Sequence, residues 1–159
     1  MSMLKKKQSE SEICKINTKF GTVEADLDSA IYFPKGIVGF CKSNYYCITN
    51  VPENKLPGAF LLQSLDQQDL CFIILNLPEK LYTGENALIN YDDISDAVEN
   101  FKIGKNNLEI MAIAKISKKD DNIRISINLR APLFIDIKNK IAYQHVFVKD
   151  DYPLAYYLN

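Results

Sequence analysis

The most constraining segment of the chain reads Asn128-Leu-Arg-Ala-Pro-Leu-Phe-Ile-Asp-Ile137, and an alternating run leads into it. From Ile123 to Leu129 every second residue is apolar, which is the two-residue period of a strand with one buried face. Pro132 has no backbone N–H and holds Ala131 in an extended conformation, so it interrupts the hydrogen-bonded ladder. The sequence therefore predicts two strands that meet at a corner, the second over Leu133–Ile137.

Further strand patterns lie on both sides of this corner. A hairpin is predicted for residues 13–17 and 22–26, and single strands for 45–49, 59–63, 70–77, 108–116 and 141–148. The run at 70–77 is continuously apolar, which is typical of a strand buried on both faces. The polar segment 117–122 is expected to be a hairpin loop. Residues 31–40 contain a proline and two glycines, so we expect an ordered, tightly packed loop there.

One helix is expected, with Asp92 or Asp93 as its N-cap and Gly104 at its end. Its apolar residues recur at helical spacing: Ile94, Ala97, Val98 and Phe101. Since strands dominate, the predicted fold class is mainly β. We expect a small antiparallel β-barrel-like or two-sheet fold with one short helix.

Composition indicates an ordinary globular chain with one core. Of 159 residues, 47% are hydrophobic and 25% are charged, so a single domain over residues 12–159 is expected. Residues 1–11 are polar and lysine-rich, which predicts a disordered tail. With 19 basic and 20 acidic residues, the chain lacks the excess of positive charge that is typical of direct nucleic-acid binding. No apolar run approaches the roughly 18 residues of a membrane helix, so a cytoplasmic, monomeric protein without membrane contact is expected.

No catalytic group, metal site or cofactor is predicted. The four cysteines, Cys14, Cys41, Cys47 and Cys71, include no C-x-x-C pair, which favours free thiols over disulfides or a zinc site. The adjacent acidic pairs lie in predicted loops or caps, where solvation or capping is favoured over a calcium site: Asp92-Asp93, Asp120-Asp121 and Asp150-Asp151.

His145 is the single histidine, and it lies in the last strand pattern without a recognised nucleophile context. A hydrogen-bonded or surface histidine is therefore favoured over a general base. The alternative is a small-molecule-binding or hydrolytic β-barrel around His145, which requires a concave pocket with convergent polar groups. Direct RNA binding is a third possibility, and it requires a basic face with exposed aromatic side chains.

Four large apolar side chains lie in the last eight residues, one before and three after Pro153: Tyr152, Tyr156, Tyr157 and Leu158. Such side chains must either dock on the body of the protein or meet a partner. Docking on the body is favoured.

Three motifs and one further residue resemble the bacterial FliW family of flagellar assembly factors. The motifs are Phe33-Pro-Lys-Gly-Ile-Val-Gly-Phe40, Phe60-Leu-Leu-Gln-Ser-Leu-Asp-Gln-Gln-Asp-Leu-Cys-Phe72 and Asn128-Leu-Arg-Ala-Pro-Leu-Phe-Ile135, and Gln144 occupies the place of a family glutamine. Their order and spacing agree over roughly residues 14–154. Val38 departs from the family's usual second proline, Ile141-Ala-Tyr143 stands where a basic turn is common, and the tail is unusually apolar.

The resemblance implies a β-barrel-like, non-enzymatic protein that binds cytoplasmic flagellin and, in exchange, the translational repressor CsrA, keeping it from messenger RNA. Exchange of this kind needs only about 1–3 kcal/mol of unfavourable coupling between the two partners. The motifs predict ten residues that build or border the binding surface: Phe33, Pro34, Lys35, Gly36, Phe40, Gln63, Ser64, Asn128, Ala131 and Pro132. A purely fold-determining role is the competing interpretation for about half of them, above all Gly36, Phe40 and Pro132.

Overall fold

The structure is a computed structural model that describes residues 12–148 and 152–159. The predicted disordered tail, residues 1–11, lies outside the described residues, as does the acidic pair Asp150-Asp151. Eleven strands are present in the described chain: β1 Ile13–Thr18, β2 Gly21–Asp26, β3 Ile31–Tyr32, β4 Tyr45–Asn50, β5 Ala59–Ser64, β6 Cys71–Asn76, β7 Leu108–Lys119, β8 Asn122–Ile127, β9 Leu133–Asp136, β10 Ile141–Gln144 and β11 Tyr156–Tyr157. The α-helix, α2, spans Tyr91–Phe101, and single 3-10 turns cover Leu27–Ser29, Pro52–Asn54, Glu79–Leu81 and Lys105–Asn107.

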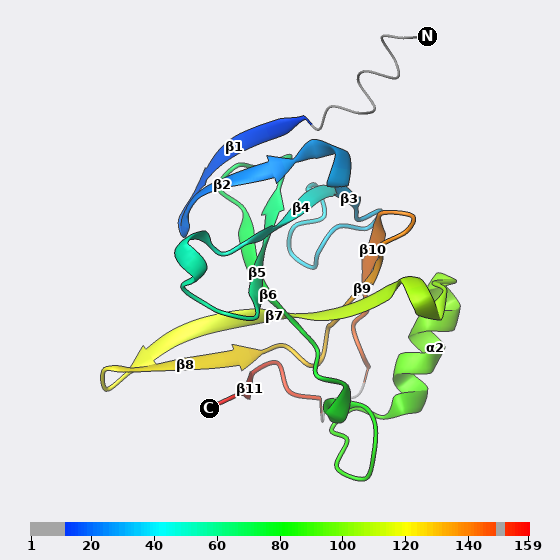
Figure 1. Cartoon of the computed structure of the whole chain (residues 1–159). Helices are drawn as coiled ribbons and strands as arrows, with labels where there is room; N and C mark the ends of the chain where they lie inside the picture. The colour runs from blue at the N-terminus through cyan, green and yellow to red at the C-terminus, as the bar shows by residue number, and fades with distance from the viewer. Residues whose placement is uncertain (1–11, 149–151) are drawn as a thin grey trace, which may run out of the picture.

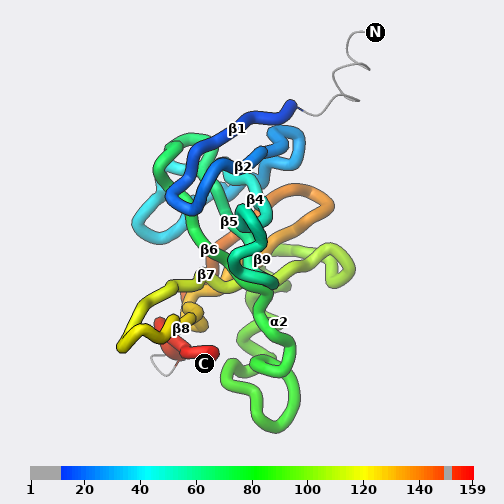
Figure 2. Tube along the Cα trace, turned by 60° about the vertical axis from the view of Figure 1, so that its left-hand side comes forward, coloured from blue at the N-terminus to red at the C-terminus, as the bar shows by residue number. Residues whose placement is uncertain are grey.

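Seven strands close into a ring, so the predicted mainly β, barrel-like fold class is confirmed. The ring order is β7-β6-β5-β4-β3-β10-β9, and β9 pairs back onto β7. The pairing of Tyr32 with Ile141 is parallel, and the other pairings among the described strands are antiparallel. Strands β8 and β11 extend the sheet beyond β7, while β1 and β2 form a separate hairpin. Figure 1 and Figure 2 show this hairpin and α2 at opposite ends of the molecule.

Two apolar clusters stabilise the ring from its two sides. The interior cluster takes alternate residues from all seven strands: Ile31, Tyr46, Leu62, Ile74, Met111, Leu133, Ile135 and Ala142. The outer cluster combines outward residues such as Leu61, Ile73 and Ala112 with the hairpin's Val23 and the helix's Ile94. Burying a side chain of this size contributes about 1.5–3 kcal/mol, so β4, β5, β6, β7 and β9, which have residues in both clusters, are stabilised on both faces.

The corner at Pro132 forms as predicted. Strands β8 and β9 both pair with β7, through Ala114–Ile127 and Met111–Leu133. The Asn128 N–H still donates to the Ile113 carbonyl at 2.9 Å, and residues 129–132 then leave the ladder as a large bulge. The Asn128 Oδ1 atom accepts hydrogen bonds from the N–H groups of Arg130 and Ala131 at 3.0 and 3.1 Å, which supplies partners that the interrupted ladder cannot.

Both ends of the helix differ from the prediction. Asn90, rather than Asp92 or Asp93, is the N-cap, because its side chain accepts a hydrogen bond from the Asp92 N–H at 2.9 Å. The helix ends at Phe101, and its C-cap, Lys102, adopts a left-handed conformation with φ 57°, so Gly104 does not terminate it. Backbone hydrogen bonds from the Lys102 N–H to the carbonyls of Val98 and Glu99 hold this conformation.

Two strand predictions change in length. The β7–β8 hairpin turns within Asp120–Asp121, both at positive φ, so the strands replace most of the predicted loop at 117–122. Strand β10 ends at Gln144, so the predicted strand over 141–148 is wrong from His145 onward. There the N–H groups of His145 and Phe147 donate to carbonyls of the corner, Pro132 and Arg130, at 3.1 and 2.8 Å. The corner residues do not form a strand, so residues 145–147, which are hydrogen-bonded to them, do not continue β10.

The predicted docking of the C-terminal segment is confirmed. Tyr156 and Tyr157 pair with Ile127 and Ser126 of β8, and Tyr152 is buried, with 3% of its surface exposed. Among the described residues, no helix is both long and apolar enough to span a membrane.

Candidate protein-binding site

The segment between β3 and β4, residues 33–44, is a loop folded against one end of the ring. The predicted loop at residues 31–40 is confirmed from Phe33 onward, whereas Ile31 and Tyr32 form β3. Phe33 and Ile37 are buried within the interior cluster. The Gly36 N–H donates to the Phe33 carbonyl and the Phe40 N–H to the Ile37 carbonyl, at 3.0 and 2.7 Å, so the loop consists of two tight turns. Gly36 has φ +64°, a backbone conformation that glycine adopts without strain because it has no Cβ atom. The loop is therefore an ordered, internally bonded element.

A first set of hydrogen bonds ties this loop to the turn after β5. The Asp66 carboxylate accepts from the N–H groups of Asn44 and Tyr45 at 2.7 and 3.0 Å. The hydroxyls of Ser43 and Ser64 are 2.5 Å apart and both buried. Ser64 Oγ also accepts from the Asp66 N–H at 3.1 Å. The loop and the turn thus share one polar network, and fully satisfied networks of this kind rigidify the structure.

A second set ties the loop to the Pro132 corner through Gln144. The Gln144 Oε1 atom accepts from the Val38 N–H at 2.8 Å, and its Nε2 group donates to the Ala131 carbonyl at 3.2 Å. One carboxamide therefore joins two segments that lie almost a hundred residues apart in the chain. The three motifs and Gln144 form one contiguous region, which the sequence order alone does not reveal.

Most of the ten predicted site residues lie inside this region rather than on its surface. Six are buried, namely Phe33, Gly36, Gln63, Ser64, Ala131 and Pro132, two are half-buried, Pro34 and Asn128, and two are exposed, Lys35 and Phe40. The Gln63 Nε2 group, for example, donates to the carbonyls of Ser64 and Gln68 at 2.9 Å each and so holds the turn. Direct contact with a partner stays a prediction for all ten, and burial makes shaping of the region the main physical role of the six.

The exposed side chains on and beside the loop form a mixed apolar and basic surface. We call it the loop surface, and it consists of Tyr32, Lys35, Val38, Phe40, Lys42 and Tyr45. Val38 is 69% exposed and Tyr45 48%, although both are apolar. The rings of Tyr32 and Tyr45 lie 5.1 Å apart, and Phe40 packs edge-on against Phe72 at 5.4 Å. Exposed aromatic side chains held on a rigid support are typical of protein interfaces.

Three exposed residues of the loop surface are not among the ten residues predicted from the motifs: Tyr32, Val38 and Tyr45. The two tyrosines carry a usable signal, since they flank the loop and interfaces are rich in tyrosine. Val38 has a weaker signal, the departure from the family's proline. Its backbone is held by Gln144 and its side chain is free, so it is the residue of the loop surface most open to substitution.

Aromatic side chains surround the His145 ring. This ring is 4.9 Å from that of Phe147, 5.9 Å from Phe101 and 6.3 Å from Phe134, all in edge-on geometry. A hollow of about 340 Å³ borders it, with Asp93 and Asp96 on the helix side. The Asp93 carboxylate accepts a hydrogen bond from the Tyr152 hydroxyl. Among the described residues, neither a serine, a threonine nor a cysteine lines this hollow.

Burial lowers the pKa of His145, and the nearby Asp93 opposes that shift. The fold therefore favours the neutral imidazole, so its contribution to stability is complete above about pH 6.5. We expect the free energy of unfolding to fall as the pH drops from 6.5 through the folded pKa of His145. In a His145→Phe variant, urea unfolding should be flat over this range. An equal loss in both proteins would contradict this assignment, because the lowered pKa of Asp136 acts only below about pH 4.

The thiols and potential metal ligands give no further site. Cys14 and Cys41 are exposed and Cys47 and Cys71 buried, all four as free thiols, in agreement with the sequence prediction. Burial raises the pKa of Cys47 and Cys71 to about 11, so both are protonated at neutral pH. Within residues 12–148 and 152–159, no group of three or more potential ligands is arranged to hold a metal ion.

Comparison with known proteins gives a consistent result. A family model described as "FliW protein" matches residues 15–158. A protein of Oceanobacillus iheyensis named "Flagellar assembly factor FliW" is 30% identical over 132 residues, which cover 83% of this chain and 84% of that protein. A protein of the same name from Clostridium botulinum strain Hall is 29% identical over 145 residues, covering 91% and 96% of the two chains. The solved "Crystal structure of the flagellar assembly factor FliW" shares the fold, with a TM-score of 0.69, 23% identity and coverage of 90% and 95%.

Proposed function

The chain belongs to the FliW family, and on that premise we propose that it is a flagellar assembly factor that acts by binding other proteins. Its partners in this proposal are flagellin and, in exchange, the translational repressor CsrA, whose binding to messenger RNA it antagonises. It works in the cytoplasm as a non-enzymatic monomer without a cofactor and without direct contact with nucleic acid.

The observation that supports a binding role is the loop surface. Folding leaves Val38 exposed on the loop and Tyr45 exposed at the start of β4, and Asp66 and Gln144 hold this region from two sides. Such a surface loses little conformational entropy when a partner docks, because its backbone is already ordered. Lys35 and Lys42 add positive charge, and the described residues place no carboxylate within ion-pair distance of either. The loop surface therefore favours a partner patch that is apolar at its centre and acidic at its edge.

The test uses two exposed positions of the loop surface. Val38→Asp places a charge in the apolar centre of the interface, and Lys35→Glu reverses the charge beside it. We expect each to weaken the affinity for purified flagellin or for the CsrA homologue by about tenfold or more, measured by titration calorimetry. Thermal unfolding should be nearly unchanged, because neither side chain is buried.

The matched control is Lys118→Glu, an exposed lysine on β7 far along the hairpin from the loop. It makes the same change in net charge and should leave both affinities within about twofold of wild type. If both loop variants bind as tightly as this control, the loop surface is not the binding site.

A further inference from the structure

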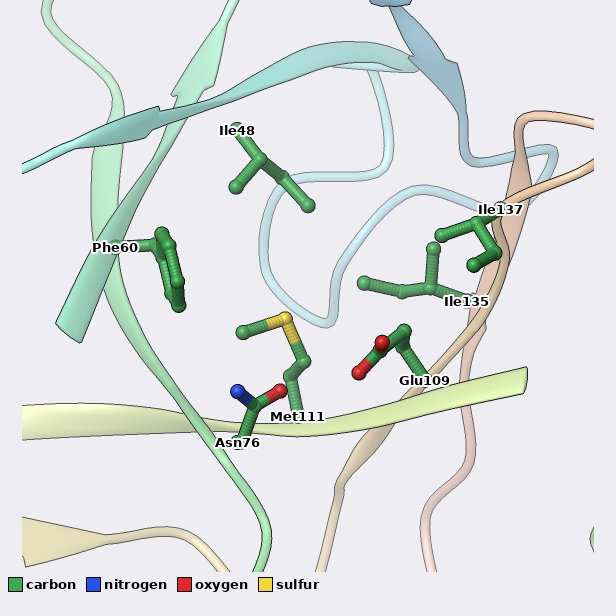
Figure 3. A pocket seen from close by; sticks show the side chains of 7 residues that line it. All are labelled: Ile48, Phe60, Asn76, Glu109, Met111, Ile135 and Ile137. Carbon is green, nitrogen blue, oxygen red and sulfur yellow. The ribbon is translucent and has the colours of Figure 1, made fainter. Parts of the chain in front are cut away.

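A second surface lies at the end of the ring opposite the 33–44 loop. A hollow of about 180 Å³ opens there, lined by Ile48, Phe60, Asn76, Glu109, Met111, Ile135 and Ile137. Six of these residues lie on β4, β5, β6, β7 and β9, and Ile137 directly follows β9. Figure 3 shows their side chains converging, with the 33–44 loop behind them. At the loop end, Phe40 packs on Phe72 of β6, which pairs with Leu62 of β5. The hollow is lined by Phe60, which lies two residues before Leu62 on β5. The hollow is thus separate from the loop surface.

The hollow lies where the strand pairing of the ring is shortest. Strand β3 pairs with β4 only at Ile31 and Tyr32, and with β10 only at Tyr32. Ile48 of β4 and Ile135 of β9 lie beyond the paired part of β3. Partly buried Ile48 and Phe60 pack against the interior cluster and line the hollow at this end, beside the buried Met111 and Ile135.

The chemistry of the hollow is apolar at its floor and acidic at its rim. Met111 and Ile135 are buried at the floor, and Ile137 is 51% exposed at the rim. In Figure 3 the Glu109 carboxylate and the Asn76 carboxamide lie on either side of Met111. The single salt bridge among the described residues is between Lys55 and Glu53, so Glu109 has no cationic partner within 4.0 Å. The rim therefore offers an uncompensated negative charge to whatever enters.

The size of the hollow decides between classes of occupant. Pockets for small-molecule ligands have volumes of about 300–1,000 Å³, and a cavity of about 150 Å³ holds a single benzene ring. At about 180 Å³, the hollow accommodates one large aliphatic or aromatic side chain and little else. Since a lone apolar molecule gains nothing from Glu109, the carboxylate adds selectivity for a neighbouring cation.

We infer that this hollow is a second docking site, which receives one large apolar side chain of a protein partner while an adjacent lysine or arginine of that partner pairs with Glu109. The inference rests on the proposed function, because it assigns to a partner of this chain a contact beyond the loop surface. It predicts that a bound partner reaches both ends of the ring, or that two partners use different ends.

Met111 provides a direct readout, since the other methionines of the chain, Met1 and Met3, are near the N-terminus. In protein labelled with 13C at the methionine methyl groups, we expect the Met111 resonance, assigned with Met111→Leu, to shift or broaden on titration with unlabelled flagellin or CsrA homologue. The Met1 and Met3 resonances should change less. A Met111 resonance that is unchanged at saturation with both partners overturns the inference.

Affinity measurements with rim variants complete the test. Glu109→Lys should weaken binding of the partner that moves Met111 by about tenfold, and Glu109→Gln by a smaller factor, because only the first introduces repulsion. The matched control is Glu99→Lys, an exposed residue of α2, which should leave the affinity nearly unchanged. Equal affinities for Glu109→Lys and Glu99→Lys overturn the inference while leaving the proposed function standing. If wild-type protein binds neither partner, the proposed function fails and the docking site fails with it.

Discussion

A Gly36→Ala variant is expected to lose roughly 3 kcal/mol of its free energy of unfolding, the sum of backbone strain and steric overlap. Gly36 has φ +64°, a conformation that L-residues rarely adopt, and a Cβ atom there would lie 2.8 Å from both the Cys41 Cα and the Phe40 carbonyl oxygen. Both contacts are with backbone, so no side-chain rotation can relieve them. Urea unfolding followed by circular dichroism measures the loss.

Gly39→Ala is the matched control for this effect. Gly39 also has positive φ, +88°, but a Cβ atom there meets no atom within 4 Å. Only the backbone strain applies, so the expected loss is about 1 kcal/mol. Equal losses at the two positions would show that the close approach of the loop to itself at Cys41 does not exist. A much larger loss at Gly36 would show that this glycine is required for folding, whatever its part in binding.

Replacing Tyr152 by alanine should cost about 3–5 kcal/mol, the range for truncating a large buried side chain. The ring packs edge-on against Phe147 at 5.1 Å. Its hydroxyl donates to the Asp93 carboxylate and accepts from the Asn90 N–H at 2.9 Å, so it stabilises the first turn of α2. Thermal unfolding compared with that of wild type measures the loss.

Truncation after Pro153 separates the two parts of the C-terminal segment. It retains Tyr152 but removes β11, whose residues are half-buried or exposed. We expect a loss of only about 1–2 kcal/mol, because the removed contacts lie at an exposed sheet edge: backbone hydrogen bonds to β8, two hydrogen bonds of the Asn159 side chain, and the Arg124 contact with the Tyr157 ring. If this truncation destabilises the protein as much as Tyr152→Ala does, then β11 rather than Tyr152 anchors the segment.

The strands could be predicted because the sequence alternates with a period of two wherever one face is buried. The corner at Pro132 could be predicted equally well, because a proline has no backbone N–H to donate to a neighbouring strand, whatever the fold around it. Closure of the ring was not readable, because the pairing of Met111 with Leu133 depends on a bulge that brings β9 to the same edge of β7 as β8. The sequence accordingly left a barrel and two packed sheets as alternatives.

The helix ends show where local signals compete. Asn90, Asp92 and Asp93 can all cap a helix, and only the backbone path selects Asn90. At the other end, Lys102 takes the left-handed conformation that glycine usually supplies, so Gly104 gave a misleading signal. The residue type does not predict that Lys102 is left-handed, because hydrogen bonds from its N–H to the Val98 and Glu99 carbonyls hold this conformation.

The sequence motifs named ten candidate residues that the structure brings into one region, and their contact with a partner stays a prediction; the motifs alone did not separate exposed residues from buried supporting ones. A motif contains residues that keep the shape, such as Gly36 and Ser64, beside residues that face solvent, such as Val38. Only burial distinguishes them, and burial depends on contacts between segments distant in sequence, above all the bridge through Gln144.

The most direct test of a protein-binding role is calorimetric titration of the wild-type chain with purified flagellin, and separately with the CsrA homologue, of the same organism. The proposed function predicts a one-to-one complex with each at micromolar or lower dissociation constant, and release of CsrA when flagellin is added. The absence of association with both proteins at concentrations of tens of micromolar would contradict it.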